Sequence, residues 1–472
     1  MSPQSCYYLD LRRCELSNAW GTNFRNSEFE KENTRPTVYI CIEQKNREYD
    51  EKILLAAELG MQNFRCYIGT HAAIWALLRT KKERSGIYFD KGTQLPETMK
   101  WIKSVCEYIV IMDVELGPVV KNIDYMFSPF LDYPHLSRLY PESEKSIDKY
   151  LCIGPKIFDH AIEAFGKDRE KVVMTGWPRM DLWEGLGSEL YSKDIIKIRR
   201  KHGKFLLFAS NFTSISDPGR EDISDIEWEI KSLNFDLFSK TISILKIWDK
   251  DPNVPKIIIR PHISEDAQIW KIALGKLKKT FIIHKGDITP WLFASEGLIH
   301  RGSTTSIQAE LGNKNTYYIS EVAENGDDDV SQRISRYIVG TGSSPRFYPS
   351  YVNLDADRLK SRKILESVLF FSPSGATQEV VDSLVDLNSV PIEKHRANKL
   401  RVSQFNKKAA LRALGLVKHE LTWKLSLTRL PSQLHNTPWG LGLLRIKKVM
   451  KLKSKYQQLN VRLITFNLWE IS

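Results

Sequence analysis

Short apolar runs and longer helical patterns alternate along most of the chain, and this alternation restricts the fold more than any other feature. The first pair is VYICIE at residues 38–43, which reads as a strand, and YDEKILLAAELG at 49–60, which has the apolar spacing of an amphipathic helix. Strands and helices that alternate at this spacing form crossover units around a mostly parallel sheet. We therefore expect an α/β protein with parallel sheets.

A charged stretch at 191–204 interrupts the alternation, which then starts again. We expect two series of strands, the first at 38–43, 64–69, 87–89, 108–112, 149–153 and 172–174, and the second at 205–210, 256–260, 281–284, 298–300 and 316–319. A chain of 472 residues has room for more than one core. The predicted parts are a polar segment at 1–35, two doubly wound domains at 36–185 and 200–345, and a helical basic extension at 346–472.

The positive charge is concentrated at one end of the chain. Residues 391–472 hold 17 Lys and Arg against 3 Asp and Glu, whereas residues 1–390 hold 52 against 54, so the net charge of +12 belongs to the C-terminal part. A protein that binds nucleic acid would spread basic residues around its binding surface. This distribution instead indicates a basic appendage on a neutral body, and we expect no nucleic-acid partner.

The beginning of the chain and its cysteines point to the cytoplasm. Residues 1–34 are polar and charged, unlike a signal peptide, and no apolar run approaches the roughly 20 residues that cross a bilayer. The six cysteines have no CxxC spacing, and Cys41, Cys106 and Cys152 lie in apolar runs. We expect buried, reduced thiols.

An acidic pair follows one predicted strand directly. In YIVIMDVELG, Asp113 and Glu115 are two residues apart on extended chain and therefore face the same side. Repulsion within such a pair raises one pKa, which suits a base, an acid or a nucleophile. The alternative is a solvated loop with two surface acids.

Polar groups also follow several strands of the second series. Arg260 and His262 in KIIIRPH offer a fixed charge and a titratable donor to a phosphate, and Asn211 in ASNFT follows the preceding strand. In the earlier TGWPRMD at 175–181, Arg179 and Asp181 read better as structural residues at a helix start.

The segment LIHRGSTTSIQAE at 298–310 predicts an anion site. His300 ends a strand, Gly302 permits a close approach of backbone, and the hydroxyls of Ser303, Thr304 and Thr305 open a helix. Helix capping alone needs only one such hydroxyl. We expect phosphate binding here, with Gln308 or Glu310 further along the helix and within reach of a ribose.

No cofactor or metal site is expected. Nothing resembles a Walker loop, a GxGxxG fingerprint, a zinc spacing or a GxSxG elbow. The acidic stretches at 327–329 and 355–357 follow no apolar strand directly, so they read as solvated loop acids.

Five segments in this order resemble the bacterial surface carbohydrate biosynthesis protein family, which has the GT-B architecture found also in Kdo transferases and CDP-glycerol transferases. They are DVELG at 113–117, IGPKIFD…TGWPRMD within 153–181, FASNF at 208–212, RPHISED…W at 260–270 and DITPWLFASEGLIHRGSTTSIQAELG at 287–312. The resemblance implies two facing Rossmann-like domains, with the nucleotide held mainly by the second. It gives Asp113 and Glu115 the acidic role, His262 a phosphate role and Ser303–Thr305 the phosphate cradle.

We therefore expect a glycosyltransferase that moves a sugar, preferably CMP-activated Kdo or a related acidic sugar, to a lipid-linked or growing glycan of surface polysaccharide or lipopolysaccharide. Asp113, Glu115 and His262 are its expected catalytic residues, and no metal is needed because Arg260, His262 and the helix start supply positive charge. Two alternatives stay open: a CDP-glycerol-type polyol-phosphate transferase and a non-catalytic nucleotide- or glycan-binding scaffold.

The segment Arg445–Lys455 predicts a place for this enzyme in the cell. It has six basic residues among Ile446, Val449, Met450 and Leu452, a composition typical of a helix at an anionic membrane surface. We expect a cytoplasmic enzyme peripheral to the inner face of the membrane; the alternative is a helix packed on the body.

Overall fold

The computed structural model describes residues 35–43, 45–81, 84–114, 143–212, 225–262, 265–284, 286–322, 330–347, 354–388, 445–446, 448–465 and 468–472. Glu115 and the acidic stretch at 327–329 lie outside these residues, as do Cys6 and Cys14.

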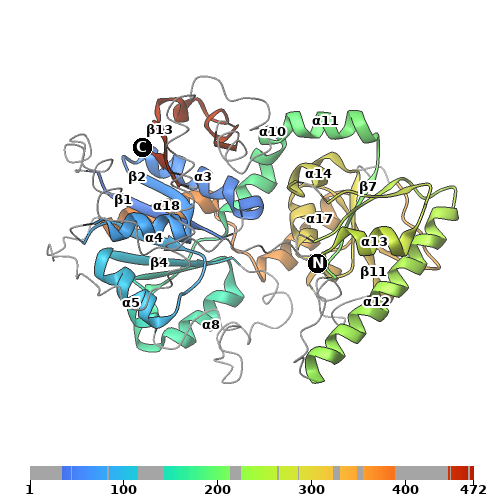
Figure 1. Cartoon of the computed structure of the whole chain (residues 1–472), viewed down its shortest axis with the longest axis horizontal. Coiled ribbons are helices and arrows are strands. Elements are labelled where there is room, and N and C mark those ends of the chain that lie inside the picture. Colours follow the sequence, from blue (N-terminus) through green and yellow to red (C-terminus); the bar gives the residue numbers. More distant parts are fainter. Residues whose placement is uncertain are drawn as a thin grey trace, which may run out of the picture. The chain divides into compact units, whose positions relative to one another are not determined.

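The first sheet has eight strands in the order β13-β14-β2-β1-β3-β4-β5-β6 (Figure 1). The strands are β1 (Thr37–Ile42), β2 (Arg65–Thr70), β3 (Ile87–Asp90), β4 (Tyr108–Asp113), β5 (Lys149–Cys152), β6 (Val172–Met174), β13 (Val461–Thr465) and β14 (Leu468–Ile471). Strands β1 to β6 pair in parallel with one another, whereas β14 pairs antiparallel with β2 and with β13.

The second sheet has six parallel strands in the order β12-β11-β10-β7-β8-β9. They are β7 (Leu206–Ala209), β8 (Ile257–Arg260), β9 (Thr280–Ile282), β10 (Gly297–His300), β11 (Asn315–Ile319) and β12 (Tyr337–Val339). The chain therefore has the predicted α/β fold, with two Rossmann-like halves built around largely parallel sheets.

Helices connect these strands and follow them. In the first half they are α3 (Lys45–Met61), α4 (His71–Arg79), α5 (Pro96–Val105), α8 (Pro155–Phe165), α9 (Pro178–Asp181), α10 (Gly187–Leu190) and α11 (Ser192–His202). Those further along are α12 (Asp225–Lys250), α13 (Ala267–Leu274), α14 (Thr289–Ala294), α15 (Thr305–Leu311), α16 (Val330–Arg333), α17 (Leu354–Glu366) and α18 (Ala376–Asn388). No helix in the described ranges is both long and apolar enough to pass through a bilayer.

The burial of the strands in the two cores explains why they could be predicted from the sequence. The strand residues of β7 and β8 are all buried, as expected for parallel strands covered on both faces. Around Trp270 the rings of Phe208, Phe212 and Phe238 pack edge-on or tilted, with centroids 4.9–5.9 Å from the indole. In the first half Cys41, Cys66, Cys106 and Cys152 are free and buried, which confirms the reading of those four thiols.

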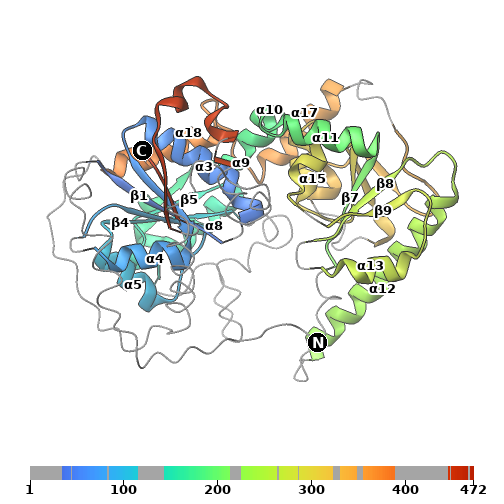
Figure 2. The ribbon, with the colours of Figure 1, turned by 45° about the horizontal axis from the view of Figure 1, so that its top comes forward.

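The C-terminal extension is not the purely helical appendage that the sequence suggested. Helix α18 packs against α3 and α9, and β14 joins the first sheet beside β2 (Figures 1 and 2). Asp181 caps α18, because its carboxylate accepts hydrogen bonds from the amides of Ala376 (3.1 Å) and Thr377 (2.8 Å). The structural reading of Asp181 is therefore confirmed, and the extension is part of the body.

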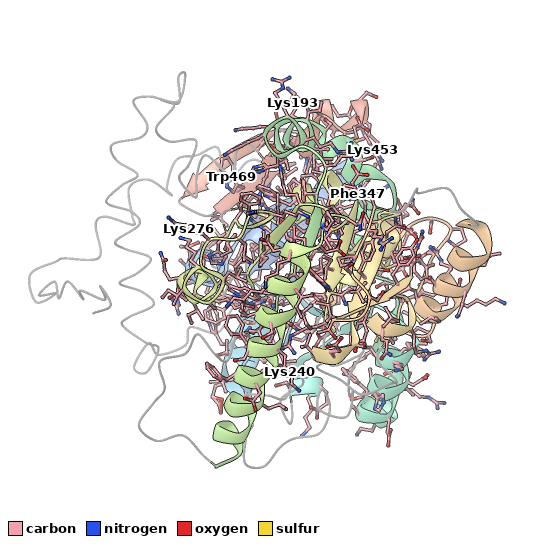
Figure 3. All side chains as sticks on the ribbon, turned by 90° about the vertical axis from the view of Figure 1, so that its right-hand side faces the viewer. Lys193, Lys240, Lys276, Phe347, Lys453 and Trp469 are labelled. Carbon is pink, nitrogen blue, oxygen red and sulfur yellow. The ribbon has the colours of Figure 1, made fainter. Side chains whose placement is uncertain are left out.

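The prediction of a membrane-surface helix at Arg445–Lys455 is wrong. Ile446 and Val449, which would have to enter the lipid, are buried within the protein at 1% and 0% exposure. Basic residues of the segment pair with acids of the body: Lys448 with Asp194, and both Lys453 (2.7 Å; labelled in Figure 3) and Lys455 (2.6 Å) with Glu58. Ile446 and Val449 are therefore not available to lipid, and these three lysines are already paired with acids of the protein.

Candidate functional site

The second sheet brings three of the predicted motifs to one edge. Strands β10, β7 and β8 are neighbours, and they lead into 301–305, 210–212 and 261–262 respectively. Because all three strands are parallel, their carboxyl ends meet at the same edge, where ligands bind in open α/β sheets. Residues that are 90 positions apart in the sequence thus become neighbours.

The turn after β10 presents the three hydroxyl residues. Gly302 has a φ of +117°, which side-chain-bearing residues rarely adopt. The Ser303 hydroxyl donates to Thr305 Oγ1 (3.1 Å) and accepts from the Thr305 amide (3.2 Å). Ser303, Thr304 and Thr305 are all half-buried. The Thr305 hydroxyl uses an acceptor lone pair in this turn and keeps its own hydrogen to donate.

His300 holds this turn and is not itself a charged ligand. It is fully buried, and burial lowers its pKa to about 3, so the ring is neutral. Ser335 Oγ donates its hydrogen to the Ser331 carbonyl and must therefore accept from His300 Nε2–H (2.9 Å). His300 Nδ1 then accepts from the Gly302 amide (3.3 Å). The expected nucleotide contact from His300 is thus replaced by a positioning role.

Arg301 connects the turn to the segment after β7. Its buried guanidinium lies 3.9 Å from the centre of the Phe212 ring and donates to the Asn211 carbonyl (3.4 Å) and to Asn234 Oδ1 (3.2 Å). The side chain of Asn211 is half-buried at this edge. Arg301 was not singled out from the sequence, although it stands inside the motif that was.

Glu265 links the segment after β7 to the segment after β8. It was not singled out from the sequence. Its buried carboxylate accepts from Ser210 Oγ (2.5 Å), the Phe212 amide (2.6 Å) and Trp270 Nε1 (2.8 Å), and burial raises its pKa. The His262 carbonyl accepts from the Glu265 amide (2.8 Å) and from His284 Nε2 (3.0 Å). The half-buried His262 is therefore held at the edge by its own backbone.

Arg260 and Gln308, which were predicted to bind the nucleotide, make hydrogen bonds within the protein instead. Arg260 is 4% exposed, donates to the Ile283 (2.8 Å) and Gly286 (2.5 Å) carbonyls, and stacks on Trp291; burial lowers its pKa to about 10. Gln308 is buried and donates to Thr289 Oγ1 (2.9 Å), so its amide reaches α14. Both shape the second half.

In the first half, Asp113 ends β4 and is completely buried. Its charge contributes, after burial, to raising the pKa of the neighbouring Cys152. The prediction that the Asp113 carboxylate projects into a cleft is not borne out, because the residue is fully buried, and its partner acid Glu115 lies outside the described residues.

Comparisons with known proteins find likeness only among solved structures. These include the wall teichoic acid polymerase TagF (12% identity over 75% of this chain and 89% of that chain, TM-score 0.41) and S. aureus MnaA with UDP (13%, 75% and 96%, 0.44). A third is a glycosyltransferase from Rickettsia africae (12%, 83% and 99%, 0.37). No protein-family model matches the chain, and no curated protein matches it. Such identities and TM-scores say nothing about a substrate.

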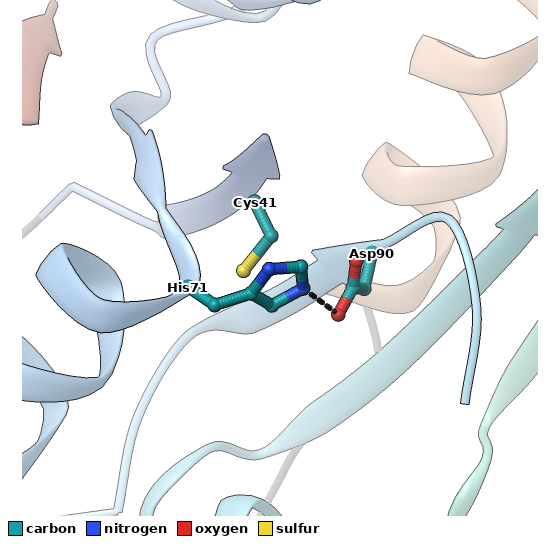
Figure 4. A group of neighbouring side chains, drawn as sticks. All are labelled: Cys41, His71 and Asp90. Atoms are coloured by element: carbon teal, nitrogen blue, oxygen red, sulfur yellow. Dashed lines mark hydrogen bonds and ion pairs between the residues drawn. The ribbon is translucent and has the colours of Figure 1, made fainter. Parts of the chain in front are cut away.

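A further group of polar residues lies at the corresponding edge of the first sheet. Cys41 near the end of β1, His71 directly after β2 and Asp90 at the end of β3 come together, with ligand atoms within 4.8 Å of one another (Figure 4). His71 Nε2 lies 2.8 Å from Asp90 Oδ2. Sequence reasoning missed this group because its members stand singly at or just after the ends of three separate strands.

Proposed function

We propose that this chain is a nucleotide-dependent transferase that moves a sugar, preferably CMP-activated Kdo or a related acidic sugar, to a lipid-linked or oligosaccharide acceptor of a surface polymer. The observation that supports this most is the meeting of the hydroxyl turn Ser303–Thr305 with His262 at one edge of the second sheet. Hydroxyl donors and an imidazole at that edge suit the phosphates of a nucleotide.

The proposed mechanism places charge stabilisation at this turn. As the bond to the nucleotide breaks, negative charge grows on its phosphate, and the hydroxyl of Thr305 and the imidazole of His262 donate hydrogen bonds to it. The buried guanidinium of Arg301, which is held by Asn211 and Asn234, adds positive potential to this edge. His300 and Glu265 keep the turn and the His262 segment in place, so that the donors are arranged before the reaction starts.

Of the two acidic residues predicted to be catalytic, we assign the role of catalytic carboxylate to Glu115 alone. Asp113 is buried at the end of β4 and cannot touch a substrate in this conformation. We propose that Glu115, two residues further on, approaches the anomeric centre as nucleophile or as charge stabiliser. Replacing Glu115 by Gln is then expected to lower turnover by roughly 100-fold while nucleotide affinity stays the same.

The test measures nucleotide binding and donor turnover separately. Calorimetry with CMP, CDP and UDP is expected to show binding that Ser303→Ala with Thr305→Ala weakens by about 1–3 kcal/mol, the usual cost of lost charge-assisted hydrogen bonds. Ser243→Ala is the matched control, because Ser243 is an exposed residue of α12. A panel of CMP-Kdo, CMP-sialic acid, CDP-glycerol and UDP-sugars, assayed for nucleotide release, identifies the donor. Equal affinity in the double variant and the wild type would contradict the phosphate site.

A further inference from the structure

The Cys41–His71–Asp90 group has one member that a substrate can reach. The side chain of His71 is 23% exposed, whereas those of Asp90 and Cys41 are about as buried as the core. All three stand at the carboxyl ends of β1, β2 and β3, which are neighbours in the order β2-β1-β3. This is the edge of the first sheet at which ligands of α/β proteins bind.

Asp90 is fixed by a complete set of hydrogen bonds. Its Oδ2 accepts from Tyr88 Oη (2.9 Å), from Gln94 Nε2 (3.2 Å) and from His71 Nε2, and its Oδ1 accepts from the Lys91 amide (2.8 Å). Although burial opposes ionisation, these partners hold the pKa of Asp90 below its ordinary value, so it is a carboxylate. An ionised Asp90 makes His71 Nε2 the protonated nitrogen and leaves the lone pair on Nδ1.

The charges around His71 are mixed in sign. Burial lowers the pKa of His71, but Asp90, and more weakly Glu43 and Glu48, outweigh it, and the pKa is raised above its ordinary value. Lys91 pairs with both glutamates, at 2.5 Å from Glu43 and 3.4 Å from Glu48. Tyr88 and Cys41 also face the group, and burial raises the pKa of each, so both are neutral.

A metal site explains this geometry less well. Four hydrogen bonds already use the Asp90 carboxylate, and an ion would have to displace some of them. The Cys41 thiol is buried beside that carboxylate, which disfavours the thiolate that a metal requires. The contacts of Asp90 with His71 and its other donors instead match those of a carboxylate that orients an imidazole for proton transfer.

We propose that His71 is the general base that takes the proton from the acceptor hydroxyl, with Asp90 as its positioning residue. This inference rests on the proposed transferase function. In the step, the acceptor oxygen forms a bond to the transferred carbon, its proton passes to His71 Nδ1, and the bond from that carbon to the leaving phosphate oxygen breaks with its electron pair. Glu115 is then the charge stabiliser and not the nucleophile. Asp90 stabilises the imidazolium that results.

The position of His71 suits this role better than that of Asp113. Asp113 ends β4, which follows β3 in the same sheet, but its carboxylate is fully buried. His71 opens α4, where the strand–helix turn brings its ring to the sheet edge. The acceptor side of the reaction is therefore assigned to the first half and the nucleotide side to the second.

The test is the pH profile of nucleotide release from the donor identified by the panel, with acceptor present. His71→Asn is expected to lower turnover by about 100-fold or more while nucleotide affinity stays the same. Asp90→Asn removes the charge that raises the His71 pKa, so the rise of activity with pH should move to lower pH and the maximum rate should fall. His202→Asn is the matched control, since His202 ends α11 at the opposite, amino-terminal edge of the second sheet.

Two results would overturn the inference without touching the proposed function: normal turnover in His71→Asn, or a pH profile that Asp90→Asn leaves in place. Thermal melts establish that each variant is folded, and if Asp90→Asn is not, the turnover of His71→Asn decides alone. A wild-type protein that turns over no donor in the panel would contradict the proposed function, and the inference with it.

Discussion

Replacing Arg445 by Met should destabilise the protein far more than the loss of an ordinary surface charge. Arg445 Nη1 lies 3.6 Å from Asp50 Oδ1 in α3, and Nη2 lies 3.2 Å from Asp287 Oδ2 just before α14. The Tyr191 hydroxyl also bonds to Asp50. Although burial opposes the charge, the two carboxylates raise the pKa of Arg445 above its ordinary value.

The expected loss of stability in Arg445→Met follows from the groups that lose their partner. Methionine fills the place of the arginine stem, but two largely buried carboxylates lose their cation, and breaking a buried pair in this way costs about 3 kcal/mol. Lys455 is the matched control, because it is 45% exposed and Glu58 keeps Lys453 as a partner. Lys455→Met should cost less than about 1 kcal/mol.

Chemical denaturation followed by tryptophan fluorescence measures both free energies of unfolding. Arg445→Lys should fall between the wild type and Arg445→Met, since lysine keeps the charge but cannot donate to two carboxylates in a fork. An Arg445→Met variant as stable as the Lys455→Met variant would refute the view that this segment is an integral part of the body.

Two other substitutions test how the edge of the second sheet is held. Glu265→Gln should lower the stability of the second half by about 2 kcal/mol, because an amide cannot accept from three buried donors as a carboxylate does, and an unchanged unfolding midpoint would contradict this. His300 has a folded pKa of about 3, below the unfolded value of about 6.5, so protons bind preferentially to the unfolded chain as the pH falls. The wild type should therefore lose about 1 kcal/mol between pH 6.5 and 5.5 through this group, and His300→Gln should lose correspondingly less; identical pH slopes would show that His300 is not buried as described.

Strands β1 to β11 could be predicted because most of them contain a short apolar run. Residues 108–112 were expected and β4 is Tyr108–Asp113; residues 298–300 were expected and β10 is Gly297–His300. Parallel strands that are buried on both faces consist mainly of apolar residues, so they can be recognised from the local sequence alone. In a parallel sheet the segments that follow the strands all lie at one edge. The three motifs after β7, β8 and β10 could therefore be placed together from the sequence.

The residues that were missed or misread depend on contacts between distant segments. Arg445 reads as one of many tail cations, and only the fold places Asp50 and Asp287 beside it. His71 and Asp90 are separated by a helix and carry no spacing signature. Strand β14 pairs with β2 across some four hundred residues, although its mostly apolar sequence at Leu468–Ile471 could have been read as a short buried strand.

A crystal of the protein soaked with CMP tests the central claim most directly, because it shows where the nucleotide phosphate lies. The account predicts a phosphate oxygen within about 3.2 Å of the Ser303 or Thr305 hydroxyl, with His262 facing the same group. A nucleotide bound elsewhere, with Ser303–Thr305 and His262 away from its phosphate, would contradict it.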